Sequence, residues 1–456
     1  MDNNVTIIKT FAEYPAFPYD NGKHPVYEAL LKTFASWGKE SKNPFSNFVR
    51  PGGTVVIKPN WVMHHNPVGS VDALITHSSL IKFVIDFAAK AMEYKGRVII
   101  GDAPLQSCDF QTLKKISRIE EIVQKAQKEY PGINIEVEDW RLTILQNPNV
   151  DAATNGPQEK YILADTGENS FLEDIAEYSS RFRVAAYPKE LMQRHHKKGK
   201  HEYLITRRVK EADLFINLAK MKTHMKAGLT GAMKNIIGIN GHKEYLPHHI
   251  KGPYSHGGDA YQRWNFFRYI HEELSDYVWD NYSRMSVVTR RVVDRILDMI
   301  RWGSIFTGGE STSFGSWSGN DTVWRTTLDL NHILYFSEYA PRHILNIVDG
   351  IIAGEGQGPL KPSPKEAGVI VVGENPAYVD AVIAALMGYN ISRIPTVFHA
   401  IYDIRSRFAG PALSQFDVTL LPDTGIAEKI SFDKLPNLRF RKPRFWKHAG
   451  KNNQSG

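Results

Sequence analysis

The chain is very poor in cysteine: Cys108 is the single one in 456 residues. A disulfide within the chain is therefore excluded, and so is a zinc or iron–sulfur site built from several of its own cysteines. We accordingly expect no iron–sulfur cluster. Low cysteine usage is typical of a reducing compartment, and we expect a cytoplasmic protein.

Long apolar runs are also missing. No stretch approaches the roughly 20 apolar residues that a transmembrane helix needs, and the N-terminal stretch MDNNVTIIKTFAEYP lacks the pattern of a secretory signal. The sequence therefore predicts no transmembrane segment. The net charge of +7 favours anionic partners without choosing among metabolites, nucleic acid and acidic lipid.

Several catalytic motifs are absent from the sequence as well. We find no G-x-x-x-x-G-K-[ST] phosphate loop, no H-E-x-x-H pair and no C-x-x-C pair. Function must therefore be argued from polar clusters and from their position relative to predicted strands.

Apolar runs and amphipathic stretches alternate along the chain, which predicts an α/β fold. Buried strands are expected at residues 54–58 and 97–100, and helices at 76–95 and 112–130. Thr76 or Ser78 is the expected N-cap of the first of these helices, and AGEGQGP (353–359) is an expected glycine loop. This alternation is typical of a mostly parallel sheet covered by helices.

Composition and pattern divide the chain into four expected regions. They are an N-terminal α/β region (1–150), a middle α/β region with a basic, glycine-containing segment (151–259), a helical insertion followed by a Gly/Ser-rich loop (260–330), and a C-terminal α/β unit with a basic tail (331–456). In the insertion, SVVTRRVVDRILDMIRW has an apolar face that we expect to pack on the protein itself, although such a helix can also lie on a membrane.

The stretch NLAKMKTHMKAGLTGAMKNIIGINGHK contains no acid. No Asp or Glu occurs between Leu214 and Lys243, whereas Asn217–Lys243 holds five lysines and two histidines. Its segment AGLTGAMKNIIG has helical spacing, with glycines in the expected first turn. A helix N-terminus surrounded by lysines predicts a phosphate or carboxylate site, with these candidate residues: Lys220, Lys222, Thr230, Lys234 and Asn235.

Other polar residues follow predicted strands, where α/β proteins bind their ligands. Lys58 and Asn60 come directly after VVI and are further candidates for anion binding. Asp102 and Asp349 also end predicted strands, and such carboxylates either cap a turn or bind a divalent metal such as Mg²⁺. His224 is the candidate for proton transfer, because its ordinary pKa lies near neutrality.

Taken together, these blocks resemble the domain of unknown function 362 family. The resemblance runs through VVIKPN, GDAP, INLAKMKTHMKAGLTGAMKNIIG, IVDGIIAGEGQGP and GENPAYVDAVIAALMG, from about Thr54 to Pro395. It implies an α/β core and the following characteristic polar positions: Lys58, Asn60, Asp102, Lys222, His224, Lys234, Asn235, Asp349 and Asp380. It implies no reaction, and the cluster-binding cysteines of many relatives have no counterpart here.

The leading hypothesis is an enzyme acting on a small anionic metabolite, by phosphoryl or nucleotidyl transfer, ligation or isomerisation. A nucleic-acid-binding protein is a second hypothesis, although the basic stretch has no aromatic residue before Tyr245 on which a base would stack. Peripheral membrane attachment through residues 287–302 is the third.

Overall fold

The structure is a computed structural model that describes residues 1–19, 24–37, 43–145, 152–154, 158–184, 187–307, 313–422 and 426–449. Part of the expected Gly/Ser-rich loop (308–312) and the end of the expected basic tail (450–456) lie outside these residues.

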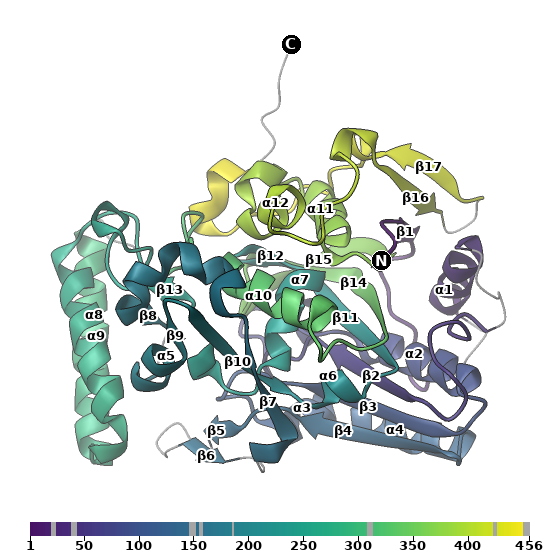
Figure 1. Ribbon diagram of the computed structural model, residues 1–456, viewed down its shortest axis with the longest axis horizontal. Helices are drawn as coiled ribbons and strands as arrows, with labels where there is room; N and C mark the ends of the chain where they lie inside the picture. The colour runs from purple at the N-terminus through teal and green to yellow at the C-terminus, as the bar shows by residue number, and fades with distance from the viewer. Residues whose placement is uncertain are drawn as a thin grey trace.

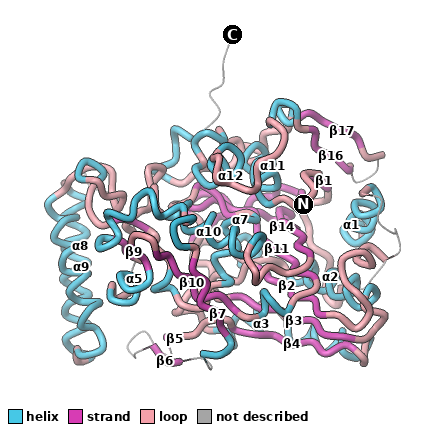
Figure 2. The backbone as a smooth tube through the Cα atoms, viewed as in Figure 1, coloured by secondary structure: helices cyan, strands magenta, loops and turns pink. Residues whose placement is uncertain are grey.

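A large, mostly parallel sheet forms the centre of the protein (Figures 1 and 2). Its strand order is β17-β16-β1-β15-β14-β11-β2-β3-β4, with β12 paired to β11. Only β15 and β17 run against the other strands of this described path. The strands of this sheet are β1 (Val5–Lys9), β2 (Thr54–Pro59), β3 (Gly96–Asp102), β4 (Ile133–Asp139), β11 (Leu214–His224), β12 (Gly228–Thr230), β14 (His343–Gln357), β15 (Lys361–Gly373), β16 (Asp417–Leu421) and β17 (Glu428–Ser431).

A three-stranded sheet (β7-β10-β9) and two strand pairs (β13-β8 and β5-β6) accompany this sheet in the described residues. They consist of β5 (Thr143–Leu145), β6 (Ala152–Thr154), β7 (Tyr161–Asp165), β8 (Phe182–Arg183), β9 (His196–Lys197), β10 (Lys200–Thr206) and β13 (His249–Ile250). The helices are α1 (Pro25–Ser36), α2 (Ser78–Ala91), α3 (Phe110–Ile116), α4 (Ile119–Glu129), α5 (Glu190–His195), α6 (Arg208–Glu211), α7 (Ala232–Asn235), α8 (Phe266–Asn281), α9 (Val287–Phe306), α10 (Val323–Phe336), α11 (Pro376–Leu386) and α12 (Pro395–Tyr402).

Helices cover both faces of the sheet. Along β2, Val55 and Ile57 belong to the core shared with α1, α2 and α4, whereas Val56 belongs to the core on the opposite face, which includes α10. Successive strand residues point to opposite faces, so a strand buried on both sides must be a continuous apolar run. This is why short runs such as VVI and VII identify the inner strands.

The strands predicted from the first half of the chain are confirmed, and three local predictions are wrong. The expected helix 112–130 is two helices, α3 and α4, because Arg118 adopts a left-handed conformation between them. His77, rather than Thr76 or Ser78, caps α2. The expected glycine loop AGEGQGP is part of β14, which pairs with β15 in an antiparallel hairpin.

Strands from three of the four expected regions join the same sheet, and the third region supplies α8 and α9. These two helices form a hairpin at one end of the molecule, on the left in Figure 1. Among the helices of the described residues, none combines the length and the apolar character needed to cross a membrane.

Candidate functional site

A cavity of about 340 Å³ lies beyond the carboxyl ends of β2, β3 and β11. β2 is the first of the inner parallel strands along the chain. β3 and β4 extend the sheet from one of its edges, whereas β11 and β14 extend it from the other. The cavity therefore lies at a topological switch point, the position at which open α/β sheets bind ligands. We call it the lysine cavity.

Positive charge dominates the lining of the lysine cavity. Five lysines and two histidines line it, and Asp102 is the one carboxylate among the described lining residues. The polar lining residues are Lys58, Asn60, Asp102, Lys222, His224, Lys226, Thr230, Lys234, Asn235, Lys243, His248, Ser313 and Ser316. The structure thus brings together most of the candidates that the sequence proposed.

Asp102 is fully engaged by groups of the protein. Its Oδ1 lies 2.7 Å from Lys58 Nζ and accepts the Ala103 N–H, while its Oδ2 accepts the Trp61 N–H at 2.7 Å. The backbone passes so close to this ion pair that a Cβ at Gly238 would overlap both side chains. Burial lowers the pKa of Lys58, and the Asp102 charge partly offsets that effect.

An amide network holds two lysines of the cavity in place. Asn235 Oδ1 accepts hydrogen bonds from Lys58 Nζ at 3.2 Å and from Asn60 Nδ2 at 2.8 Å. Asn60 Oδ1 in turn accepts from Lys222 Nζ at 2.6 Å, and the same ammonium donates to the Leu74 carbonyl. Within the described part of the chain, the acceptors of Lys222 are therefore all neutral. Burial and the Lys220 charge lower its pKa well below the ordinary value.

Three further lysines of the cavity have no counterion among the residues that the structure describes. Lys243 donates to the Ala103 carbonyl at 2.7 Å, and Lys226 donates to the Phe314 carbonyl. Lys234 Nζ has no hydrogen-bond or ion-pair partner among the residues that the structure describes, although only 8% of the residue is exposed. Burial, followed by the neighbouring cations, lowers the pKa of Lys234 to about 7. Burial likewise lowers the pKa of Lys226 and of Lys243 to about 8.

The two histidines of the cavity present different ring atoms. His224 Nδ1 accepts the backbone N–H groups of Lys226 and Ala227, so the neutral ring carries its proton on Nε2. His248 Nδ1 lies 2.7 Å from the Leu246 carbonyl and must donate to it, so its Nε2 keeps a lone pair. Burial and nearby lysines lower the pKa of both rings well below the ordinary value. The neutral ring of His224 is thus a donor and that of His248 an acceptor.

The helix predicted over AGLTGAMKNIIG forms only in the second half of this stretch, from Ala232 onward. Gly228–Thr230 pairs with β11 as β12, and α7 is a single turn. The N-terminal amides of α7 already have an anion: Asp380 Oδ1 accepts the Ala232 N–H and Oδ2 accepts the Met233 N–H at 3.0 Å. A Cβ at Gly231 would overlap this carboxylate. The lysines, rather than the helix end, carry the positive charge of the cavity.

Asp380→Asn is expected to lower the free energy of unfolding by about 2 kcal/mol at pH 8, where the carboxylate is ionised. Burial raises the pKa of Asp380 to about 7, so the measurement belongs above that pH. Asparagine offers one acceptor oxygen in place of two, which leaves one amide of α7 without its partner. Urea unfolding measures the loss, with exposed Asp417→Asn as the control. Equal stability of the two variants would contradict this role of Asp380.

Lys220 and Asp349 lie apart from the lysine cavity. They form a fully buried ion pair of 2.9 Å, and the Tyr14 hydroxyl contacts both groups at 2.7 Å. The Asp349 carboxylate also accepts the His77 N–H at Oδ2, at 3.0 Å, and the Ile351 N–H at Oδ1, at 3.3 Å. The register between β11 and β14 shifts between Lys220 and Lys222, and the two ammonium groups have different partners.

The pairing of Asp102 with Asp349 as ligands of one metal does not fit this arrangement. Asp102 lines the cavity and contacts Lys58, whereas Asp349 does not line it and contacts Lys220. Within the described part of the chain, no group of three or more His, Cys, Asp or Glu side chains has the arrangement of a metal site. Each carboxylate already has a lysine as its counterion.

Three of the basic residues that line the cavity were not among the candidate site residues: Lys226, Lys243 and His248. The two lysines belong to the acid-free stretch, so the signal for them was its charge. His248 lies in LPHHIKG, which has no recognisable spacing. The sequence offers no signal for the carbonyl contact that leaves its Nε2 as an acceptor.

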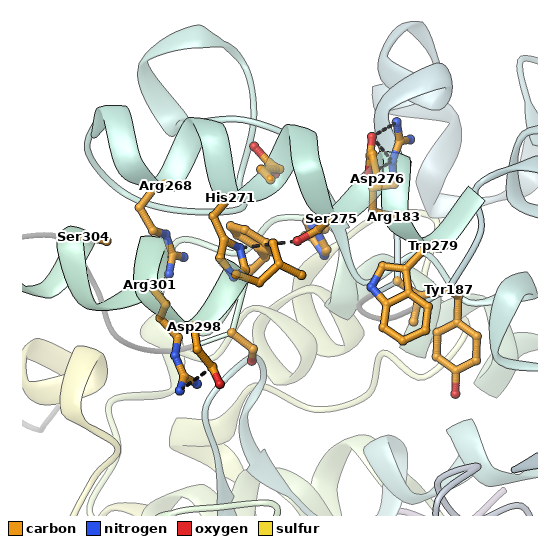
Figure 3. Close-up of a pocket in the computed structure, with 16 residues that line it drawn as sticks. Arg183, Tyr187, Arg268, His271, Ser275, Asp276, Trp279, Asp298, Arg301 and Ser304 are labelled. Carbon is orange, nitrogen blue, oxygen red and sulfur yellow. Dashed lines mark hydrogen bonds and ion pairs between the residues drawn. The ribbon is translucent and has the colours of Figure 1, made fainter. Parts of the chain in front are cut away.

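A second cavity, of about 290 Å³, adjoins the lysine cavity and shares Val184, Tyr187 and Ser313 with its lining (Figure 3). The hairpin of α8 and α9 forms one of its walls. Its charges have both signs and several are paired, as in Arg183–Asp276 at 2.9 Å and Arg301–Asp298 at 3.0 Å. Uncompensated positive charge therefore distinguishes the lysine cavity from its neighbour.

Sheet topology and cavity position define this chain as an α/β protein with a polar cavity at the switch point of its sheet. The chain belongs to the family described as Domain of unknown function (DUF362), which matches residues 150–385. The match includes the acid-free stretch, β14 and β15, and confirms the family resemblance; β2 and β3 precede it. No curated protein and no solved structure matches the chain.

Proposed function

We propose that this protein is an enzyme whose substrate is a small anionic metabolite, bearing a phosphate or a carboxylate, bound in the lysine cavity. The observation that carries the proposal is the charge of the cavity: five lysines line it, and the one carboxylate beside them in the described lining is paired with Lys58. An ammonium group buried without a counterion is costly, and an anion in the cavity removes that cost.

Burial of the lysines favours a small ligand over a nucleic acid. Lys58 and Lys222 have no exposed surface, and Lys234 and Lys243 are each 8% exposed. A nucleic-acid backbone is bound by cations on an open surface or groove, whereas these lysines are buried and line a cavity. A volume of about 340 Å³ also suits a metabolite.

The histidines of the cavity support proton transfer to and from such a ligand. The sequence proposed His224 for this role, but its Nδ1 is occupied by two backbone N–H groups. In the proposal His224 donates a hydrogen bond from Nε2 to the bound anion, and His248 accepts a proton at Nε2. The His248 ring is neutral near pH 7 and can therefore accept a proton, and a bound anion would raise its lowered pKa toward the range that suits a general base.

In this proposal Asp102 does not serve as a ligand of a divalent cation such as Mg²⁺. Asp102 is engaged by Lys58 and by two backbone N–H groups. A phosphate ligand would therefore have to supply oxygen ligands of its own, as metal-bound substrates commonly do.

The test is a thermal-shift screen of nucleotides, sugar phosphates and organic acids, each with Mg²⁺ and with a chelator. A ligand at 100 times its Kd is expected to stabilise the folded protein by about 2.7 kcal/mol, which raises Tm measurably. Lys234→Met should weaken binding of a hit by about 10- to 100-fold, because a charged hydrogen-bond donor is lost.

Lys90→Met, at the exposed C-terminal end of α2, is the matched control and should bind as the wild type does. A panel without any stabilising anion would contradict the proposal. Stabilisation by short RNA or DNA, but by no small anion, would replace it with nucleic-acid binding.

A further inference from the structure

The surface of α9 that faces away from the protein is apolar. Val288 is 70% exposed, Met299 65% and Phe306 84%, and Val292 and Trp302 are also more than half exposed. We call these five side chains the α9 outer stripe. Half of the large hydrophobic side chains that are exposed in the described chain lie between Trp264 and Phe306.

The α9 outer stripe runs along the whole helix. Its members are spaced three, four or seven residues apart, and Arg295 occupies the position between Val292 and Met299. This spacing places them all on one side of the helix. The opposite side carries Arg290 and Ser304, which are buried. A surface helix of a soluble domain normally buries its apolar side and exposes its charged and polar side. The expectation that the apolar face of this helix packs on the protein itself is therefore wrong for the described residues.

Arginines accompany the α9 outer stripe. Arg284, Arg291 and Arg295 are exposed, and none of the three has an ion-pair partner among the described residues. The acids of the helix are Asp294 and Asp298, of which Asp298 pairs with Arg301. The outward face thus combines apolar and aromatic side chains with an excess of positive charge.

We propose that the α9 outer stripe docks on an anionic lipid membrane, with the helix lying flat on its surface. Apolar and aromatic side chains insert at the boundary of headgroups and acyl chains, and arginines attract anionic headgroups. A helix of 20 residues is about 30 Å long, which gives an extended line of contact. A two-fold contact with a second copy would instead bring the same arginines toward one another, which costs energy.

This docking places the second cavity beside the membrane. Leu297, Asp298, Arg301 and Ser304 of α9 line that cavity (Figure 3). The hairpin therefore has one side toward the cavity and the other toward solvent (Figure 1). The membrane proposal does not depend on the ligand of the lysine cavity.

The test is flotation of the full chain with two kinds of vesicle at about 0.05 M salt. The neutral vesicles are pure phosphatidylcholine, and the anionic vesicles contain 30% phosphatidylserine in addition. We expect binding to the anionic vesicles and at least about tenfold weaker binding to the neutral ones. Met299→Ser/Trp302→Ser should reduce binding about tenfold or more, because two inserted side chains are lost. Arg291→Glu/Arg295→Glu should remove the preference for anionic lipid.

Ile404→Ser/Ile426→Ser is the matched control, because both side chains are more than 90% exposed elsewhere on the protein. All three double variants should keep the Tm of the wild type, and Lys234→Met should float as the wild type does. Wild-type protein that fails to float with anionic vesicles would overturn the proposal. So would a stripe variant that floats unchanged, or one whose only change is conversion of a dimer to a monomer.

Discussion

Lys220→Met is expected to lower the free energy of unfolding by about 3–5 kcal/mol. The Lys220 ammonium lies 2.9 Å from Asp349, and neither side chain has exposed surface. Methionine keeps the apolar volume but leaves the Asp349 carboxylate buried without a cation. The Tyr14 hydroxyl and the His77 N–H remain as donors, but neither compensates a full charge.

Lys234→Met is the contrasting substitution, with the opposite sign. Lys234 is buried without a partner among the described residues, and burial lowers its pKa to about 7. Methionine removes this cost, so the ligand-free protein should gain at least about 1 kcal/mol at pH 7. A lysine whose removal stabilises the fold does not serve stability, and binding of an anion is a function that it would serve instead.

Urea unfolding of both variants at pH 7 measures these changes. Lys220→Met/Asp349→Leu is the informative double variant, because removal of both charges should recover much of the loss. Equal destabilisation by Lys220→Met and Lys234→Met would contradict the distinction between the buried ion pair and the lysine cavity.

The inner strands could be predicted from the sequence because what identifies each of them is its own run of consecutive apolar residues. A strand covered on both faces must be apolar throughout, as VVI in β2 and VII in β3 are. Parallel strands also place their carboxyl ends at one edge of the sheet. The position of Lys58, Asn60 and Asp102 after such strands made them site candidates, whereas their meeting with the lysines of the acid-free stretch is seen only in the structure.

What the sequence did not show depends on contacts between distant segments. Asp380 caps α7 across 148 residues of chain, and no periodicity indicates that pairing. Lys220 and Lys222 are two residues apart and look equivalent, yet the local register shift in β11 gives one of them Asp349 and the other Asn60. Charge composition predicts a basic site but not which cations are already paired.

For α9, the spacing of apolar residues predicts the stripe but not whether that stripe is buried or exposed. The sequence identifies its apolar stripe, and the 3.6-residue period predicts which residues share a side. It does not decide which side meets the rest of the protein. Arg290 is buried over the Tyr282 ring, whereas Val288 and Met299 are exposed. Sequence alone cannot reveal this inversion, because it depends on how α8 and the second cavity meet the helix.

Anion binding in the lysine cavity is expected to take up protons and to weaken as pH rises. In the free protein the pKa of Lys234 is about 7, and that of Lys226 and of Lys243 is about 8. A bound anion favours the ammonium form and raises each pKa. Affinity should therefore be greatest below pH 7 and fall about tenfold per pH unit for each lysine that titrates between its free and bound pKa.

Calorimetry at pH 8 in buffers of different ionisation enthalpy measures the uptake directly. The ligand should be a hit from the screen that does not titrate between pH 7 and pH 9. We expect an uptake of about one to two protons, because Lys226 and Lys243 are already about half protonated at pH 8, and Lys234→Met should reduce the uptake by about one. The two histidines contribute little, because their lowered pKa values keep both rings neutral in this range. Binding without proton uptake would mean that the lysines have the same protonation state in the free protein and in the complex, and would contradict this prediction.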